Sequence, residues 1–283
     1  MKIAITGATG FIGCHVRDVL ARTTHEVVLV ARHPEKVVQK SQKEFVVSAD
    51  LSEERTDWFE LLGAPDAVMH FAWGGLSNYM DVDHVDIELP IQLRLMRALT
   101  KSGLKKLLVS GTCFEYGLVD GSVSESTATH PVIPYAIAKD ALRKELFKIQ
   151  SESDLDLTWT RIFYAYGDGQ SEKSIFTQLK QSIEKKEEFF LMSSGKQVFD
   201  FIEVNRVAQI LSELIIHKNG VGLLNIGSGT PTNLLSFVLE QINRFGSSIT
   251  PLTDSLPDRT WEPKSYWSDN TKIQSLLSQD LIG

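Results

Sequence analysis

Apolar positions along the chain switch repeatedly between the spacing of a strand and the spacing of a helix. Six short apolar runs are predicted as buried strands. After the first of them, apolar residues recur on one helical face at Ile12, Val16, Val19 and Leu20, and similar helical stretches separate most of the others. The predicted strands cover residues 3–6, 26–31, 45–48, 66–72, 106–110 and 157–163.

The predicted helices begin at recognisable signals. Ser52 is the expected N-cap of a helix over residues 52–62, and Pro134 suits the first turn of another. A long helical stretch over residues 82–102 is interrupted by Pro90. The second half of the chain adds a strand over 199–203 and helices over 171–186, 204–218 and 234–245.

Strands that alternate with helices predict βαβ units, and therefore a parallel sheet with right-handed crossovers. We predict an α/β protein with a doubly wound, Rossmann-type parallel sheet. In such sheets the ligand lies beyond the carboxyl ends of the strands, so the side chains at these ends are the candidates for chemistry.

The first predicted strand runs directly into a glycine-rich turn. Gly7, Gly10 and Gly13 have the spacing of a dinucleotide-binding loop. Gly7 allows a backbone conformation that other residues resist, Gly10 lets the chain approach a pyrophosphate, and Gly13 brings helix and strand together. An ordinary surface turn is the alternative interpretation. A second glycine-rich turn, over residues 227–229, is expected to be an ordinary turn.

Arg32 follows the second predicted strand, about 20 residues after the glycine turn. An NAD-binding unit usually places a carboxylate near this position, where it holds the ribose 2′-hydroxyl. A guanidinium suits a 2′-phosphate instead, so the sequence favours NADP(H), with NAD(H) as the alternative cofactor. A solvated arginine at a strand end is the competing structural interpretation.

Tyr135 and Lys139 share a helix face, because they lie four positions apart in the helix that begins at Pro134. An ammonium about 4 Å from a phenol favours the phenolate by roughly 3 pKa units, so we expect Tyr135 to exchange protons near neutral pH. Thr112 follows the fifth predicted strand, where its hydroxyl can hold a substrate oxygen. The alternative is an incidental pair on a solvated helix.

These motifs together resemble an extended short-chain dehydrogenase/reductase of the NAD-dependent epimerase/dehydratase type, along essentially the whole chain. The resemblance implies that Tyr135 is the acid/base, that Lys139 holds the nicotinamide ribose, and that Thr112 orients the reacting oxygen. Tyr135 and Lys139 would thus also contact the cofactor. The other implied cofactor contacts are Gly7, Thr9, Gly10, Phe11, Ile12, Gly13, Arg32, Asp50, Leu51, Phe71, Ala72, Trp73 and Phe163.

The resemblance also implies two parts of the chain. Residues 1–163 and about 199–226 would form a dinucleotide-binding Rossmann domain. Residues about 164–198 and 227–283 would form a lobe that binds a nucleoside-diphosphate sugar.

The segments around Thr112 and Tyr135 are similar to bacterial 4-ketoreductases of 6-deoxyhexoses, such as dTDP-4-dehydro-6-deoxyglucose reductase and CDP-abequose synthase. The implied reaction is NADPH-dependent reduction of the C4 ketone of a nucleoside-diphosphate 4-keto-6-deoxyhexose, in deoxysugar and surface polysaccharide biosynthesis. The alternatives are an NAD-dependent nucleotide-sugar 4-epimerase and a non-catalytic NADP-binding sensor.

Some positions depart from the family pattern. Cys113 and Phe114 follow Thr112 where the sugar dehydratases carry Asp-Glu, so dehydration is disfavoured. Tyr164 replaces the Asn of a further motif, and Arg259 becomes the remaining candidate for a diphosphate contact. Cys113 is expected to be an inert lining residue. The expected substrate contacts are Thr112, Cys113, Phe114, Tyr164 and Arg259.

The composition of the chain limits which binding partners and which cellular compartment we expect. The chain of 283 residues lacks an apolar run of the roughly 18 residues that a membrane span needs. A net charge of −7 opposes polyanions, so neither nucleic acid nor a membrane is an expected partner. Two cysteines and a start without signal-peptide character predict a cytoplasmic protein, and the histidines show no metal-ligand spacing, so no metal site is expected. A homodimer is left open.

Overall fold

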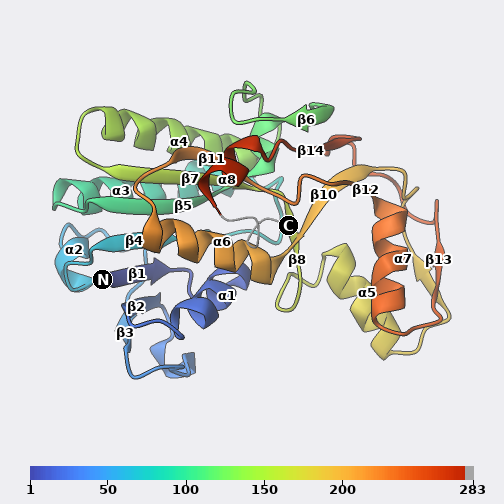
Figure 1. The fold of residues 1–283 in the computed structure, drawn as a ribbon, viewed down its shortest axis with the longest axis horizontal. Helices are drawn as coiled ribbons and strands as arrows, with labels where there is room; N and C mark the ends of the chain where they lie inside the picture. The colour runs from blue at the N-terminus through green and yellow to red at the C-terminus, as the bar shows by residue number, and fades with distance from the viewer. Residues whose placement is uncertain (278–283) are drawn as a thin grey trace.

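A parallel sheet of seven strands forms the centre of the computed structural model, which describes residues 1–277. Its strands are β1 (Lys2–Thr6), β2 (Glu26–Ala31), β3 (Glu44–Ser48), β4 (Ala67–His70), β5 (Lys106–Thr112), β7 (Asp156–Ile162) and β11 (Gly222–Ile226). They lie in the order β11-β7-β5-β4-β1-β2-β3, and every neighbouring pair is parallel (Figure 1). The predicted doubly wound α/β fold is confirmed.

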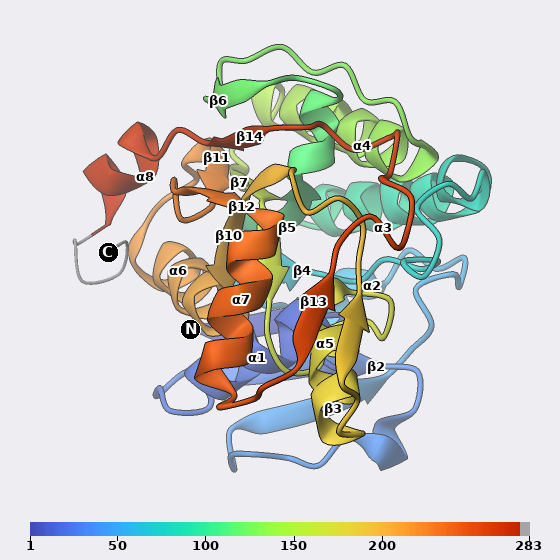
Figure 2. The same ribbon diagram turned by 90° about the vertical axis from the view of Figure 1, so that its right-hand side faces the viewer.

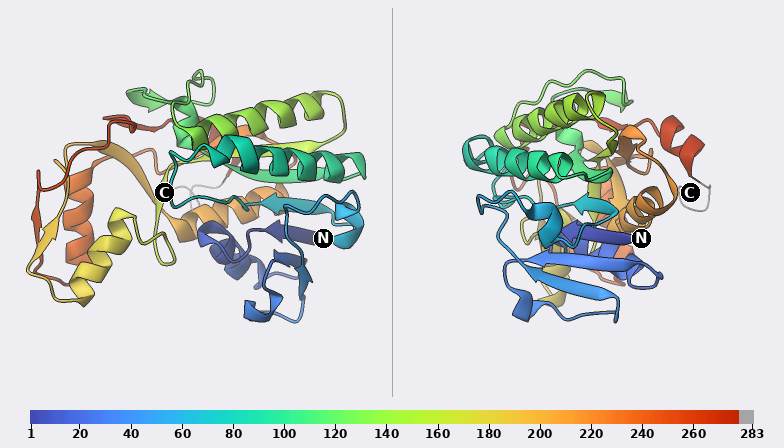
Figure 3. Two further views of the ribbon diagram at one scale, coloured as in Figure 1. Left: turned by 180° about the vertical axis from the view of Figure 1, so that it is seen from behind. Right: turned by 90° about the vertical axis from the view of Figure 1, so that its left-hand side faces the viewer.

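Helices cover both faces of this sheet, because alternate residues of each strand point to opposite sides. These helices are α1 (Phe11–Leu20), α2 (Trp58–Leu61), α3 (Leu89–Lys101), α4 (Pro134–Ser151), α6 (Val204–His217) and α8 (Thr271–Leu276). Ile3 and Ile5 pack with α1 and α6 on one face, whereas Ala4 packs with α3 and α4 on the other. Figure 3 shows α3 and α4 side by side over the second face.

A smaller lobe lies beyond the carboxyl ends of the large sheet (Figure 2). Its elements are β8 (Tyr164–Tyr166), β9 (Phe189–Leu191), β10 (Val198–Glu203), β12 (Pro231–Asn233), β13 (Thr250–Leu252), α5 (Ile175–Glu184) and α7 (Leu234–Arg244). β10 lies between β12 and β8, and β13 pairs with β9. Phe201 of β10 stacks on Phe237 of α7 with ring centroids 3.9 Å apart, so this lobe has an aromatic core of its own.

β10 and α6 connect the two parts of the molecule. β10 pairs within the small sheet, and α6 begins at the next residue, Val204, and packs against α1. We retain the two-part division inferred from the sequence as a proposal, with β10 and α6 as its connection. Its last residues, 278–283, lie outside the described part of the chain.

The segment after β3 differs from its prediction. The helix expected over residues 52–62 is reduced to α2, and Asp57 holds the N-cap position. The Asp50 carboxylate accepts a hydrogen bond from the backbone N–H of Ser52 at 2.9 Å, and the Glu53 carboxylate accepts one from the N–H of Asp50 at 3.0 Å. Side chains therefore satisfy this backbone in a turn, and the expectation that Ser52 caps a helix is wrong.

Three further boundaries were misplaced by the sequence pattern. Residues His84–Glu88 form a π-helical turn that continues directly into α3, so Pro90 lies just after the change from π- to α-helical geometry and does not interrupt the helical stretch. β4 ends at His70 rather than at residue 72, and β5 continues to Thr112 rather than ending at residue 110. Thr112 is thus the last residue of a strand at the carboxyl edge of the sheet.

Candidate active site

A cavity of about 1090 Å³ opens at the carboxyl edge of the large sheet and extends into the small lobe, where Phe176 and Phe237 line it. It brings together every residue that the sequence nominated for a site. These are Gly7, Thr9, Gly10, Phe11, Ile12, Gly13, Arg32, Asp50, Leu51, Phe71, Ala72, Trp73, Thr112, Cys113, Phe114, Tyr135, Lys139, Phe163, Tyr164 and Arg259. Their individual roles stay predictions.

The glycine turn has the tight geometry that its sequence predicts. Gly7 has a φ of +72°, and a side chain there would meet the backbone nitrogen of Ala72 at 2.6 Å. A side chain at Gly13 would overlap the carbonyl oxygen of Gly7, so helix α1 could not approach β1 so closely with any other residue. The turn therefore presents the start of α1 to the cavity.

Arg32 and Asp50 line the same cavity, in the segments that follow β2 and β3. Arg32 is exposed, and Asp50 is half-buried. Hydrogen bonds from Ser52, and then the charge of Arg32, lower the pKa of the Asp50 carboxyl against the effect of its burial. A cation and a carboxylate thus face the cavity where the ends of two neighbouring strands meet.

Thr112 is held rigidly at the end of β5. Its backbone N–H donates to the Glu115 carboxylate at 2.9 Å, and its hydroxyl oxygen accepts from the N–H of Phe114 at 3.3 Å. Glu115 is fully buried and also accepts from the guanidinium of Arg161 at 2.8 Å. This reciprocal capping fixes where the threonine hydroxyl meets the cavity.

Lys139 points into the sheet rather than along its own helix. Its ammonium donates to the backbone carbonyl of Ser110 at 2.9 Å and lies 4.1 Å from the ring centroid of Trp73. The side chain is 1% exposed. Burial lowers the pKa of Lys139 to about 7, although the carboxylates of Glu115 and Glu88 oppose this shift.

The pKa of Tyr135 moves in the direction opposite to our expectation. Burial raises it well above 10, the neighbouring Tyr79 adds to this effect, and the Thr112 hydroxyl opposes it. The Lys139 ammonium lies 6.0 Å from the Tyr135 ring centroid, because Ser110 and Trp73 hold it elsewhere. The predicted stabilisation of the phenolate by Lys139 is therefore wrong for this geometry, and Tyr135 carries its proton at neutral pH.

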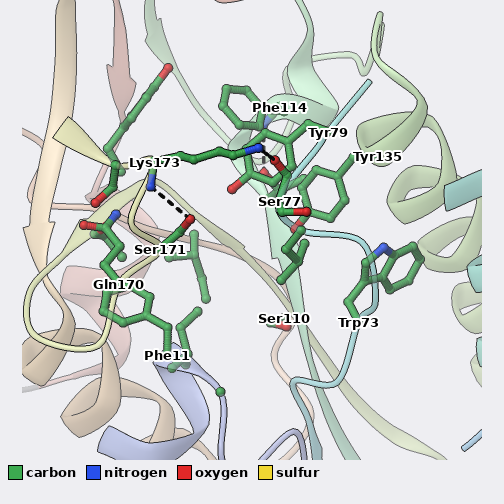
Figure 4. Close-up of a pocket in the computed structure, with 18 of the residues that line it drawn as sticks. Phe11, Trp73, Ser77, Tyr79, Ser110, Phe114, Tyr135, Gln170, Ser171 and Lys173 are labelled. Carbon is green, nitrogen blue, oxygen red and sulfur yellow. Dashed lines mark hydrogen bonds between the residues drawn. The ribbon is translucent and has the colours of Figure 1, made fainter. Parts of the chain in front are cut away.

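Aromatic side chains from three separate segments form a cluster that packs on Tyr135 through Tyr79. Tyr79 stacks on it, and Trp261 lies edge-on to both Tyr79 and Phe114, with centroids 6.2 and 5.7 Å away. Figure 4 shows Tyr79, Phe114, Tyr135 and Trp73 on one side of the pocket. Neither Tyr79 nor Trp261 was predicted as a site residue; the only sequence signal for Trp261 was the cluster of Pro257, Trp261, Pro263 and Trp267 near the end of the chain.

Arg259 has a partner that the sequence analysis also missed. Its guanidinium donates to the Glu262 carboxylate at 3.0 Å, and both residues line the cavity. Burial raises the pKa of Glu262, and the charge of Arg259 opposes this effect. The spacing of three positions was the local signal for this pair.

Cys113 is buried at the back of the cavity. Burial raises the pKa of its thiol to about 12, so the thiol stays protonated and is a poor nucleophile. Within residues 1–277, no group of three or more His, Cys, Asp or Glu side chains is arranged to hold a metal ion. No described helix has the length and apolar character to cross a membrane.

The backbone N–H groups of the turn over residues 227–229 donate to a side chain of the protein itself. The buried carboxylate of Asp200 accepts hydrogen bonds from the backbone N–H groups of Ser228 at 2.6 Å and Gly229 at 3.1 Å. It also accepts from the N–H of Ser268 at 2.9 Å. These donors have an internal acceptor, so the turn is structural, as predicted.

Residues 3–227 match the family described as the NAD dependent epimerase/dehydratase family. The chain is 29% identical over 271 residues to dTDP-6-deoxy-L-talose 4-dehydrogenase (NAD(+)) of Aggregatibacter actinomycetemcomitans, which covers 94% of this chain and 99% of that protein. It is 23% identical over 350 residues to dTDP-L-rhamnose 4-epimerase of Burkholderia thailandensis, which covers 99% of this chain and 96% of that protein.

Solved structures share the fold. A UDP-glucuronic acid 4-epimerase mutant from Bacillus cereus, in complex with UDP-4-deoxy-4-fluoro-glucuronic acid and NAD, has a TM-score of 0.85 at 23% identity, covering 97% of this chain and 92% of that one. MoeE5 in complex with UDP-glucuronic acid and NAD has a TM-score of 0.83 at 24% identity, covering 98% and 92% of the two chains.

Proposed function

Since the chain belongs to the NAD dependent epimerase/dehydratase family, we propose that it reduces the C4 ketone of a nucleoside-diphosphate 4-keto-6-deoxyhexose with NADPH. The observation that carries this proposal is the position of Thr112, Tyr135 and Lys139 on one cavity with the glycine turn. A cavity that continues into the small lobe has room for both a dinucleotide and a nucleotide sugar.

The residues at the cavity fit a dinucleotide. The turn around Gly7 and Gly13 has no space for side chains and leads into the N-terminus of α1, as a pyrophosphate site requires. Arg32 supplies an exposed cation where the adenosine ribose of such a cofactor would lie. We therefore favour NADPH, although the name of the talose relative includes NAD(+), which makes NADH the competing cofactor.

Tyr135 can supply the proton that reduction at C4 needs. Reduced nicotinamide, when bound, supplies a hydride to C4. Tyr135 carries a phenol proton, as an ordinary tyrosine does at neutral pH, and it can donate this proton to the C4 oxygen. Thr112 orients that oxygen with its fixed hydroxyl, and Lys139 holds the cofactor ribose. A 4-epimerase would use the same three residues, and net consumption of NADPH separates the two activities.

The side chains after Thr112 argue against dehydration. Cys113 keeps its proton, and Phe114 has none to exchange, so neither can serve as the acid and base that removal of water needs. The talose relative is named for chemistry at C4 of a dTDP-linked 6-deoxyhexose, which supports the proposed substrate class. We place the reaction in the cytoplasm, in deoxysugar biosynthesis for surface polysaccharides.

The test is to mix the purified protein with NADPH and a dTDP-4-keto-6-deoxyglucose pool, and to follow nicotinamide absorbance and the sugar by NMR. We expect stoichiometric loss of NADPH and a new 4-hydroxyl group. Interconversion of two 4-hydroxy sugars without net cofactor loss would indicate a 4-epimerase, and cofactor binding without turnover would indicate a sensor. Tyr135→Phe should lower kcat by about 10²- to 10⁴-fold and leave NADPH binding intact.

A further inference from the structure

Trp73, a predicted cofactor contact, is held by a histidine. The indole N–H of Trp73 donates to Nδ1 of His84 at 3.1 Å. The other ring nitrogen, Nε2, lies 3.0 Å from the backbone carbonyl of Asn78, so it must carry the ring proton. These two contacts fix the tautomer of His84 and orient its ring.

His84 is buried and tightly packed by the loop that carries it. The residue is 1% exposed. It is also the first residue of the π-helical turn that precedes α3, a distortion often found at functional sites. A side chain at Gly75, which has a φ of +70°, would come within 3.1 Å of the imidazole. The loop between β4 and α3 therefore closes tightly around this ring.

The same ring lies against the catalytic group. The centroids of His84 and Tyr135 are 5.3 Å apart, and Trp73 lies edge-on to Tyr135 at 6.1 Å. The face of Trp73 in turn contacts the ammonium of Lys139, 4.1 Å from the ring centroid. A single hydrogen bond to His84 thus controls the orientation of the indole that packs against Lys139.

We propose that His84 is a positioning residue, which holds the Trp73 indole against Lys139 and so places the ammonium for the nicotinamide ribose. The inference rests on the proposed cofactor site but not on the identity of the sugar. His84 does not touch the reacting atoms; it acts through Trp73.

Two substitutions separate the roles of the imidazole nitrogens. His84→Asn keeps an acceptor near the position of Nδ1, whereas His84→Gln keeps a donor near the position of Nε2. We expect His84→Gln to weaken NADPH binding about fivefold, the effect of losing one hydrogen bond, and His84→Asn to bind as the unchanged protein does. Titration of nicotinamide fluorescence measures both affinities without any sugar.

Two controls test for general damage to the fold: the binding of a cofactor fragment, and a substitution at Trp73. The probe 2′,5′-ADP lacks the nicotinamide ribose, so its affinity should be the same in all variants. Trp73→Phe removes the indole N–H but keeps an aromatic face; it should match His84→Gln, and the double variant should be no weaker than either single one. Equal NADPH affinity in His84→Gln and His84→Asn, or weaker 2′,5′-ADP binding in His84→Gln, would overturn the inference. If no keto sugar is reduced while the pattern of NADPH affinities holds, the proposed function fails and this inference stands.

Discussion

Tyr79 lies face to face on Tyr135, with ring centroids 4.9 Å apart and planes 19° apart. The backbone N–H of Tyr135 also donates to the carbonyl of Tyr79 at 3.2 Å. The loop that carries Tyr79 is tied to the small lobe, because the Lys173 ammonium donates to the carbonyl of Ser77 at 2.9 Å (Figure 4). The position of the proposed acid thus depends on a loop that contacts both parts of the molecule.

Replacing the Tyr79 ring should therefore disturb catalysis. A stacked aromatic pair contributes about 0.5–1.5 kcal/mol, so we expect Tyr79→Leu to lower kcat about two- to tenfold. Tyr79→Phe keeps the stack and serves as the matched control. Steady-state kinetics with the 4-keto sugar measure both variants. A higher kcat in Tyr79→Leu would show instead that the ring obstructs the substrate.

Arg32 should discriminate between the two nicotinamide cofactors. A charge-assisted pair with a 2′-phosphate is worth about 1.5–3 kcal/mol, so Arg32→Ala should weaken NADPH binding at least about tenfold. NADH lacks this phosphate, and its affinity should not change. Titration of both cofactors against both proteins gives the four dissociation constants. Equal losses for NADPH and NADH would contradict a role of Arg32 at the 2′-position.

Lys139 should make stability depend on pH. Its folded pKa is about 7, below its ordinary value near 10, so between these values the unfolded chain binds one proton more than the folded protein does. The free energy of unfolding should therefore rise with pH across this window, by at most about 1.4 kcal/mol per pH unit. Lys139→Met removes this contribution.

The measurement for Lys139 is urea denaturation of both proteins from about pH 6 to about pH 10. The stability of the unchanged protein relative to Lys139→Met should be nearly constant close to pH 6 and should then increase with pH up to about pH 10. A constant difference over this range would mean that Lys139 keeps an ordinary pKa in the folded protein.

Asp200 should be essential for the packing of the small lobe. Its buried carboxylate accepts hydrogen bonds from Ser228, Gly229 and Ser268, and the amide of Asp200→Asn would turn a donor toward these donors. We expect a loss of at least about 2 kcal/mol in the free energy of unfolding. Glu172→Gln, at an exposed position, is the control. Equal stability of the two variants would disprove this role.

The sequence by itself predicted the fold, and the candidate site residues that it nominated line one cavity. The change of apolar period predicted six of the seven strands of the large sheet and left the segment of β11 unassigned. Because ligands lie beyond the carboxyl ends of parallel strands, the candidate site residues were expected at one edge of the sheet. Gly7, Thr112 and Tyr135 could be nominated because each belongs to a local motif attached to a strand end or a helix start. Local signals of this kind depend on residues close together in the chain.

Tertiary structure alone decided the electrostatics of the site. Tyr135 and Lys139 are four positions apart, yet the ammonium turns toward Ser110 and Trp73, and burial sets both pKa values. Tyr79 reaches the site from a loop with no periodic pattern of its own. Burial and partner choice depend on how segments distant in sequence pack together, and the cost of removing a charge from water is determined only once that packing exists.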